Sequence, residues 1–345
     1  MMISPKSYPN FAFGWLELLV NGHFLPFLLT EAAHGWPILV DLIYEYLEFA
    51  NPLLSSSDYN EATRALYRGL IRTFLVILQD APQFLITFGR ILVSVVPEEA
   101  IQLRNIILAP VPRTFQNLPD PLAGSVSQQL GPIEKIDSVW LAEVQRTFKS
   151  SVRTIIQELF SIEALLSSSS VNLYVERLLG ACKVDNGSLD ARELNFALLF
   201  LELLELLNVK EGENALGFVE KSKSYAVVFS IASDYHKGGT GELLYHTLTS
   251  IADGLVFPCN LTTFNHHLLI HLFCTSSSEV KEVITRVLLE RLIVHRPHPW
   301  GVMITLIELV RNSKLKFWNQ SFTHATPEIE RVFEAISKSC IHADR

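Results

Sequence analysis

The sequence has little glycine, few cysteines and a low share of charged residues. Glycine is 16 of 345 residues, which is scarce for the turn-rich all-β folds. The four cysteines contain no C-x-x-C pair, so neither a disulfide framework nor a zinc-site spacing is present. Charged residues are 19% and hydrophobic residues 49% of the chain. That much apolar surface offsets the entropy of ordering, which excludes disorder across the whole chain.

Targeting and membrane signals are also missing from the sequence. The start MMISPKSYPN lacks a basic region followed by an apolar run, so no signal peptide is predicted. The longest stretch without Asp, Glu, Lys or Arg runs from Gly254 to Ser278 and contains Pro258 and three histidines. A helix in lipid hardly tolerates those residues. We therefore expect a soluble protein from a reducing compartment.

Positive charge is absent from a long part of the first half. Lys plus Arg are 28 and Asp plus Glu are 36, which gives a net charge of −8. No Lys or Arg lies between Ser7 and Thr63, whereas basic residues exceed acidic ones from Lys281 to Lys316. An acidic chain is unsuited to neutralising nucleic-acid phosphates as its main task. A partner that meets both ends needs a surface of mixed charge.

Helical periodicity dominates what is present, and strand signals are nearly absent. Apolar residues recur at the i, i+3, i+4, i+7 spacing, and prolines such as Pro37, Pro82 and Pro299 stand where first helical turns would begin. With mostly short gaps, and no repeat motif of fixed period, this pattern predicts an all-α fold, a HEAT/armadillo-like α-solenoid of antiparallel helix pairs. The predicted helices are Phe11–Val20, Pro37–Ala50, Asn60–Leu78, Pro82–Val95, Glu98–Leu108, Val139–Leu166, Val171–Ala181, Ala191–Leu207, Ala215–Ser233, Glu242–Gly254, Leu261–Phe273, Ser278–Val294, Pro299–Val310 and Pro327–Ser337.

One segment, residues 110–138, is rich in proline and has little periodicity. It divides the chain into an N-terminal helical lobe, residues 1–109, and a C-terminal helical lobe, residues 139–345. A long proline-rich loop inside a compact array is usually a binding loop or a disordered tether, and both fit this sequence.

Two patterns resemble metal sites but are incomplete. The segment from Cys182 to Glu193 matches the rear half of a calcium loop, but Cys182 and Val184 stand where oxygen ligands are needed. We interpret it as a glycine turn followed by Asp190 capping a helix. His267 and His271 share a helix face, but no third ligand is evident. The sequence therefore predicts no metal, no cofactor and no catalytic residue.

A basic and aromatic set near the C-terminus supports an alternative function. Aromatic rings among basic residues can form a platform that stacks the bases of single-stranded RNA. The alternative prediction is therefore an RNA-binding helical module, and the simpler interpretation is that the aromatic rings pack at helix ends. The set is Arg286, Arg291, Arg296, Arg311, Lys314, Lys316, Trp300, Phe317 and Trp318.

Several stretches resemble a known family. The run HRPHPWG at His295–Gly301, the Phe317-Trp318-Asn319 triplet and PEIE at Pro327–Glu330 are the most specific. With them, the tail from Ile284 to Cys340 closely resembles the C-terminal end of the large scaffold subunit of the Ccr–Not mRNA deadenylase complex. Three further stretches resemble the same family, namely FGWLELL at Phe13–Leu19, IQLRNIIL at Ile101–Leu108 and LPDP at Leu118–Pro121.

This resemblance implies one continuous Not-type homology domain, taken from a much longer scaffold. In that family the domain is a non-catalytic platform on which the smaller Not-box subunits dock, and here they would arrive as a heterodimer. It further implies roles in mRNA deadenylation, decay and translational repression, in the cytoplasm including P-bodies and in part in the nucleus. No small-molecule substrate or membrane partner is expected, and a direct RNA contact would be weak.

We expect partners to bind at the LPDP loop, at the HRPHPWG elbow between two helices and at the Phe317-Trp318 pair. Trp300 has a second interpretation, as a core residue. The predicted partner-binding residues are Leu118, Pro119, Asp120, Pro121, His295, Arg296, Pro297, His298, Trp300, Phe317 and Trp318.

Overall fold

The computed structural model describes residues 4–30, 32–56, 59–115, 117–123, 126–135, 150–161, 168–184, 187–210, 214–234, 241–331 and 333. These residues form helices and no strand, with one isolated bridge between Lys183 and Leu189. The prediction of an all-α fold is therefore confirmed. Within this described part, no single helix is both long and apolar enough to cross a membrane. The helices Pro9–Leu19 and Phe24–Thr30 reach that length and composition only when they are taken as a pair, and the chain bends by 62° between them.

The chain divides into two compact units. Unit 1 is Met1–Gln116 with His295–Pro297, and unit 2 is Asn117–Val294 with His298–Arg345. The division thus falls inside the proline-rich segment 110–138, and it assigns three residues of the HRPHPWG elbow to unit 1.

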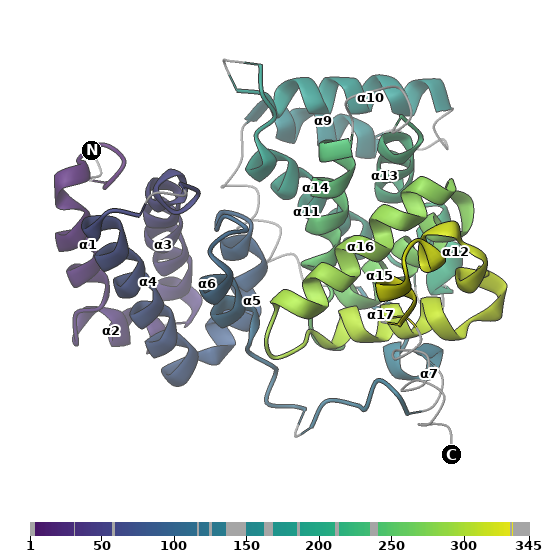
Figure 1. Cartoon of the computed structure of the whole chain (residues 1–345). Coiled ribbons are helices and arrows are strands. Elements are labelled where there is room, and N and C mark those ends of the chain that lie inside the picture. The colour runs from purple at the N-terminus through teal and green to yellow at the C-terminus, as the bar shows by residue number, and fades with distance from the viewer. Residues whose placement is uncertain are drawn as a thin grey trace. The chain divides into compact units, whose positions relative to one another are not determined.

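Unit 1 contains the helices drawn from purple to blue in Figure 1. Helix α2 packs against α3, α1 against α4, and α6 against both α4 and α5. The bounds are η1 Pro9–Phe11, α1 Ala12–Leu19, α2 Phe24–Thr30, α3 Ala32–Leu54, α4 Glu61–Asp80, α5 Pro82–Val93 and α6 Ile101–Leu108.

Helix α4 illustrates how the sequence encodes this unit. The Asn60 side chain caps the helix by accepting a hydrogen bond from the Thr63 backbone N–H at 2.8 Å. One face then buries Leu66, Leu70, Phe74 and Ile77 at the spacing of a packed helix. The helix ends at Asp80, because Pro82 begins α5 two residues later and disfavours helical backbone before it.

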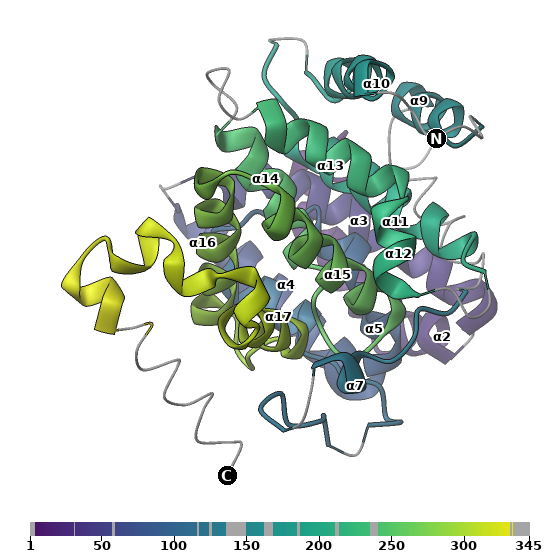
Figure 2. The same ribbon diagram turned by 90° about the vertical axis from the view of Figure 1, so that its right-hand side faces the viewer.

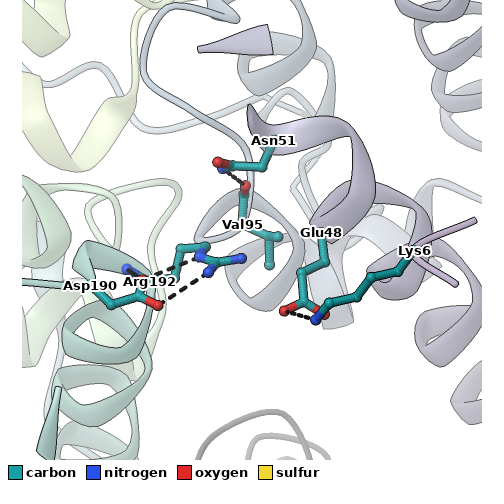
Figure 3. Close-up of polar contacts among 6 residues, drawn as sticks. All are labelled: Lys6, Glu48, Asn51, Val95, Asp190 and Arg192. Carbon is teal, nitrogen blue, oxygen red and sulfur yellow. Dashed lines mark hydrogen bonds and ion pairs between the residues drawn. The ribbon is translucent and has the colours of Figure 1, made fainter. Parts of the chain in front are cut away.

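Two polar contacts connect distant parts of unit 1 (Figure 3). The Asn51 side-chain amide donates to the carbonyl oxygen of Val95, which lies beyond the end of α5. The Lys6 ammonium pairs with the Glu48 carboxylate on α3 at 3.0 Å. Lys6 is the only basic residue that precedes the long stretch without Lys or Arg, and the pair ties the N-terminal segment to α3.

Two predictions for unit 1 are wrong. Helix α2 was not predicted, and Pro37 was expected at a helix start, whereas α3 begins at Ala32 and contains Pro37 in its interior. An interior proline removes one backbone hydrogen bond. The neighbouring Trp36 packs edge-on against Phe84 and Phe88 of α5, with ring centroids 5.8 and 6.3 Å away. These tertiary contacts stabilise helical backbone across a residue that disfavours it.

Unit 2 is drawn in teal to yellow in Figure 1, and α15 lies among its neighbours in Figure 2. Helix α15 contacts α11, α12, α13, α16 and α17, so its buried side chains form the middle of the core. The bounds are α7 Val126–Leu130, α9 Ser150–Ser161, α10 Ser168–Ala181, α11 Ala191–Leu207, α12 Ala215–Glu220, α13 Lys223–Ser233, α14 Gly241–Ala252, α15 Asn260–Thr275, α16 Ser278–Val294, α17 Trp300–Arg311, η3 Ser313–Leu315, η4 Phe317–Asn319 and η5 Ser321–His324.

The start of α11 confirms the predicted cap. Asp190 Oδ1 accepts a hydrogen bond from the Arg192 backbone N–H at 3.1 Å, and the Arg192 guanidinium pairs with the same carboxylate (Figure 3). In a calcium loop the Asp190 side chain would be directed at the metal, but here its carboxylate bonds the first turn of α11.

The helix predicted over Ala215–Ser233 is interrupted, because a second cap lies inside it. Ser222 Oγ accepts from the Tyr225 backbone N–H at 3.1 Å and begins α13. The Glu205 carboxylate accepts from the backbone N–H groups of Lys223 and Ser224 at 2.6 and 3.2 Å. A serine flanked by lysines carries this cap, which periodicity alone does not reveal.

Two other predicted segments are only partly described. Of the helix predicted over Val139–Leu166, the structure describes α9, and the flanking residues 139–149 and 162–166 lie outside the described part. The predicted helix Pro327–Ser337 is helical over residues 327–331 and at 333, and the remainder lies outside the described part. The segment 110–138 was predicted to be a loop, but it contains the short helix α7.

Candidate protein-binding site

The LPDP loop lies in unit 2 and is attached to α17 at two points. Trp300 Nε1 donates a hydrogen bond to the carbonyl oxygen of Pro119 at 2.8 Å. Arg311 Nη1, at the other end of α17, donates to the carbonyl oxygen of Leu122 at 3.2 Å. Asp120 is exposed, and its Oδ1 accepts from the Leu122 backbone N–H at 2.9 Å. The loop is therefore held in one conformation that presents the Asp120 carboxylate.

The residues that follow the loop continue as a strap over unit 2. Leu118 and Leu122 pack against an apolar cluster of Val126, Leu130, Trp300, Ile304 and Ile307. Farther along, Thr263 Oγ1 donates to the carbonyl oxygen of Leu130 at 2.9 Å, and Asn260 Oδ1 accepts from the Glu134 N–H at 3.1 Å. The described part of the proline-rich segment in unit 2 is thus bound along α15 and α17, as in an ordered binding loop.

Three predicted partner-binding side chains are buried. Trp300 and Phe317 are each 1% exposed, and His295 is 3% exposed. A side chain so enclosed cannot touch a partner unless the protein opens. The core interpretation of Trp300 agrees with this burial, and direct contact by these three side chains does not. Buried side chains can instead fix the conformation of exposed neighbours, as Trp300 does for the LPDP loop.

The HRPHPWG elbow combines buried and exposed residues. Arg296 and Pro297 are exposed, and the peptide bond between them is cis. His298 Nδ1 donates to the carbonyl oxygen of Leu292 at 2.7 Å, which satisfies an acceptor in the last turn of α16. Pro299 then precedes α17 in extended conformation. Two prolines and one histidine cap therefore define the backbone of this turn.

The contacts around Gly301 explain why the elbow ends in a residue without a side chain. A Cβ atom built on Gly301 would lie 2.7 Å from the carbonyl carbon of Leu255 and 2.7 Å from Thr262 Cγ2. The Gly301 N–H donates to the Val256 carbonyl at 2.9 Å. The first turn of α17 therefore lies directly on the backbone after α14, at a distance that only glycine allows.

In unit 1, the IQLRNIIL stretch forms α6 and carries two polar contacts. Arg104 is buried, and its Nη1 donates to the carbonyl oxygens of Val93 and Val96 at 3.0 and 2.8 Å. A guanidinium at a helix C-terminus satisfies orphan carbonyls and complements the helix dipole. The next residue, Asn105, accepts a hydrogen bond through Oδ1 from Nδ1 of His295, which is assigned to the same unit.

The Phe317-Trp318 pair lies on the 3-10 helix η4. Phe317 stacks on Phe273 with centroids 6.2 Å apart, and Trp318 is half-buried with its Nε1 donating to the carbonyl oxygen of Val310 at 3.1 Å. The preceding Lys316 adopts a left-handed conformation with φ of 51°, which turns the chain out of η3. Of this predicted pair, Trp318 alone keeps a surface that a partner can reach.

The RNA-binding alternative loses its platform in this structure. Trp300 and Phe317 are enclosed and cannot stack on a base. Arg291 is buried and pairs with Asp253 at 3.1 Å, and Arg286 pairs with Glu290 at 2.8 Å. The basic and aromatic side chains that adjoin one another in the sequence are thus divided between core and surface.

The described residues contain no group of three or more His, Cys, Asp or Glu side chains that could hold a metal ion. His266 and His267 lie next to each other on α15, with ring centroids 5.1 Å apart. Burial lowers the pKa of His267 to about 4, and it lowers the pKa of His266 well below the ordinary value, assisted by His267. His266 is buried and its Nδ1 is hydrogen-bonded to Thr305 Oγ1 at 3.0 Å, whereas His267 is half-buried beside it. At neutral pH both imidazoles are therefore neutral.

Two residues of the loop and elbow contacts were not found from the sequence. Arg311 was assigned to the basic and aromatic set, and Asn105 lies within the IQLRNIIL stretch, but neither was connected with the LPDP loop or the elbow. The contacts span 189 positions for Arg311 and Leu122, and 190 positions for His295 and Asn105.

Comparison with known proteins agrees with this architecture. The family model described as CCR4-Not complex component, Not1 matches residues 1–337. The CCR4-NOT transcription complex subunit let-711 of Caenorhabditis elegans is 28% identical over 99% of this chain and 13% of its own length. General negative regulator of transcription subunit 1 of Schizosaccharomyces pombe is 29% identical over 97% of this chain and 16% of its own length. The chain therefore spans less than a fifth of these relatives.

Two solved structures share the fold. The NOT1 superfamily homology domain from Chaetomium thermophilum superposes with a TM-score of 0.74 at 22% identity, covering 97% of this chain and 65% of that one. A Not1 C-terminal domain in complex with Not4 superposes with a TM-score of 0.72 at 24% identity, covering 96% of this chain and 65% of that one. The family match spans nearly the whole chain, and the chain belongs to the Not1 family of CCR4-Not complex components.

Proposed function

We propose that this chain is a non-catalytic docking domain of a CCR4-Not scaffold and that it binds the smaller Not-box subunits, which arrive as a heterodimer. The family match over residues 1–337 supports the scaffold role. The Not1 C-terminal domain of similar fold is in complex with Not4, so a domain of this architecture binds a protein partner. Helical arrays commonly bind extended segments in the same way.

The observation that carries the proposal is the attachment of the LPDP loop by a buried side chain. Trp300 orders the Pro119 carbonyl from within, and Asp120 remains exposed on the outer side. A loop held before binding loses little entropy when a partner engages it. We assign partner contact to Asp120 in unit 2 and, as a separate contact, to Arg296 in unit 1.

The remaining predicted residues then fall into two roles. Trp300 holds the Pro119 carbonyl from the interior, Phe317 packs on Phe273, and His295 bonds the Asn105 side chain. The other predicted residues are exposed or half-buried, namely Leu118, Pro119, Pro121, Pro297, His298 and Trp318. Docking of this kind would support mRNA deadenylation, decay and translational repression. We place it in the cytoplasm, including P-bodies, and in the nucleus.

The test is light scattering on a sizing column. The chain is mixed with the C-terminal regions of the two Not-box subunits from the same organism, and a stable ternary peak is expected. Asp120→Asn keeps the hydrogen-bond acceptor but removes the charge, and Arg296→Glu reverses a charge on the elbow. Both should weaken the complex, and Asp120→Asn should do so without lowering Tm, whereas Glu176→Gln on the exposed face of α10 should leave binding and Tm unchanged. Elution of the chain alone at every concentration would overturn the proposed function.

A further inference from the structure

Helix α4 of unit 1 carries a row of three arginines, Arg64, Arg68 and Arg72, along one face. All three side chains are exposed, and none forms an ion pair or hydrogen bond with another described residue. A spacing of four residues places successive guanidinium groups one turn apart, about 6 Å along the helix axis. They are also the first basic residues after the stretch from Ser7 to Thr63 that contains none.

The row is unfavourable for the helix itself. Like charges four residues apart repel, and Arg68 and Arg72 have no acidic residue three or four positions away on α4. The acidic residues of α4 are Glu61 and Asp80, at its two ends. Glu61 lies three positions before Arg64 and compensates that end of the row alone, so Arg68 and Arg72 are suited to anionic groups from outside the chain.

The i, i+4 ridge on which the arginines lie winds slowly around α4, by about 40° per step, and leads into a largely apolar cavity. The positions that continue the row are Val76 and Asp80, and both line a cavity of about 500 Å³ between α2 and the end of α4. Its other walls are largely apolar and include Leu25, Pro26 and Leu29. Val76 is 41% exposed and the adjacent Leu75 is 47% exposed, so the rim of the cavity is accessible.

We infer that the α4 row and the adjoining cavity bind an acidic segment of a protein partner, with an apolar side chain of that segment inserted in the cavity. Charge determines the direction of the bound segment. Its acidic residues lie over Arg64, Arg68 and Arg72, and the end that passes Asp80 is neutral or basic. The inference rests on the proposed function, because one of the Not-box subunits would supply the segment.

The cavity favours a protein segment over a nucleic acid. Aliphatic walls accommodate an aliphatic or aromatic side chain, and among the described residues that line the cavity none is aromatic and could stack on a base. Asp80 at the rim and the net charge of −8 both repel a polyanion. A short acidic segment meets the three arginines and avoids Asp80.

The experiment titrates the full chain with the C-terminal regions of the two Not-box subunits by calorimetry, at low and at high salt. The row variant is R64Q/R68E/R72E, which keeps a like-charge pair at Arg68 and Arg72 with reversed sign and avoids a new repulsion between Glu61 and position 64. The control is R331Q/K210E/K221E, which changes the net charge equally at exposed positions outside α4 and outside the segment 110–138. The row variant should bind about tenfold more weakly or worse and with a flatter salt dependence, whereas the control should bind as the wild type.

The outcomes separate the two proposals. Wild type that binds and a row variant that binds equally well overturn this inference and leave the proposed function standing. Wild type that fails to bind overturns both. The row variant could instead bind the Not-box subunits normally but lose binding to a single-stranded RNA oligonucleotide, or lose a dimer that the wild type forms. Either result assigns the row to another occupant and overturns the inference. If the row variant melts early, Val76→Lys tests the cavity instead, and unchanged binding by that variant also overturns the inference.

Discussion

Trp300 donates its indole N–H to the carbonyl oxygen of Pro119 at 2.8 Å across 181 positions of the sequence. The ring is 1% exposed and belongs to the cluster on which Leu118 and Leu122 pack. The Trp300 ring therefore packs in the core, while its N–H holds the backbone of a surface loop. A tryptophan in a family motif can thus be required for binding without touching a partner.

This relationship predicts different effects for two substitutions at Trp300. Trp300→Phe keeps most of the ring but leaves the Pro119 carbonyl without its donor, at a cost of about 1 kcal/mol of stability. Trp300→Ala also removes the buried ring, at a cost of about 3–5 kcal/mol. In Trp300→Phe, the hydrogen-exchange rate of the loop's backbone amides, those of Leu118, Asp120 and Leu122, should rise, while Tm falls only slightly. Trp318→Phe is the matched control, because its N–H bonds Val310 and not the loop. Unchanged exchange at the loop in Trp300→Phe would contradict the assigned role.

The sequence located the loop and the elbow but not which of their side chains lie at the surface. HRPHPWG and LPDP stood out through their resemblance to the family. Two prolines were expected to fix the backbone of HRPHPWG, whereas the segment that contains LPDP fitted both a binding loop and a disordered tether. In the structure, hydrogen bonds hold both. Burial was the missing property, because Trp300 and His295 acquire it from partners more than a hundred positions away. An aromatic or histidine in a turn has no local signal that distinguishes a core position from an exposed one.

Gly301 predicts a second test, of packing at the start of α17. Gly301→Ala places a methyl group 2.7 Å from Leu255 backbone and Thr262 Cγ2, so one of these elements must shift. The expected loss is about 1–3 kcal/mol of unfolding free energy, measured by denaturant titration. Gly217→Ala, within α12, has nothing within 4 Å and should instead stabilise by up to about 1 kcal/mol. A stable Gly301→Ala variant would show that the helix start is less constrained than its contacts indicate.

The buried histidines predict acid sensitivity. Burial lowers the pKa of His267 to about 4, below the value near 6.5 that the unfolded chain has. The unfolded state therefore binds more protons, and the stability that His267 contributes above pH 6.5 is lost as the pH falls toward 4. Protonation of His267 alone lowers the free energy of unfolding by about 3 kcal/mol once the pH is below its folded-state pKa, and protonation of His266 lowers it as well.

The measurement is the unfolding free energy of wild type and His267→Gln between pH 7.5 and 4.5. The variant should lose less stability on acidification. His324→Gln is the control, because the hydrogen bond to Glu330 raises the pKa of that exposed histidine, so the substitution cannot reduce the acid-induced loss. Equal pH dependence in wild type and His267→Gln would assign the acid sensitivity to other groups.

The fold was largely predictable because most helices bury a periodic apolar face. The predicted helices Ala191–Leu207 and Ser278–Val294 coincide with α11 and α16. Failures occurred where a tertiary contact or a cap outweighed the pattern. Trp36 packs on α5, and α3 is helical on both sides of Pro37. Ser222 with Glu205 begins α13 inside the segment that was predicted as one helix. The basic row on α4 was invisible to motif analysis, since its significance depends on exposure and on the cavity beside it.

A last prediction concerns the energetic cost of that row in the free protein. Arg68 has a like charge on both sides at four-residue spacing, so Arg68→Gln removes two repulsive pairs at once. Each pair costs about 0.2–0.5 kcal/mol, and the variant should be more stable by about 0.5 kcal/mol, with a larger gain at low salt, where screening is weak. Arg177→Gln is the opposite case, because it breaks an exposed ion pair with Glu158 at 2.7 Å and should leave stability unchanged or slightly reduced. Denaturant midpoints at 20 mM and 500 mM salt measure both. A salt-independent loss of stability in Arg68→Gln would mean that the guanidinium contributes packing to α4, and the row would then need no partner to explain it.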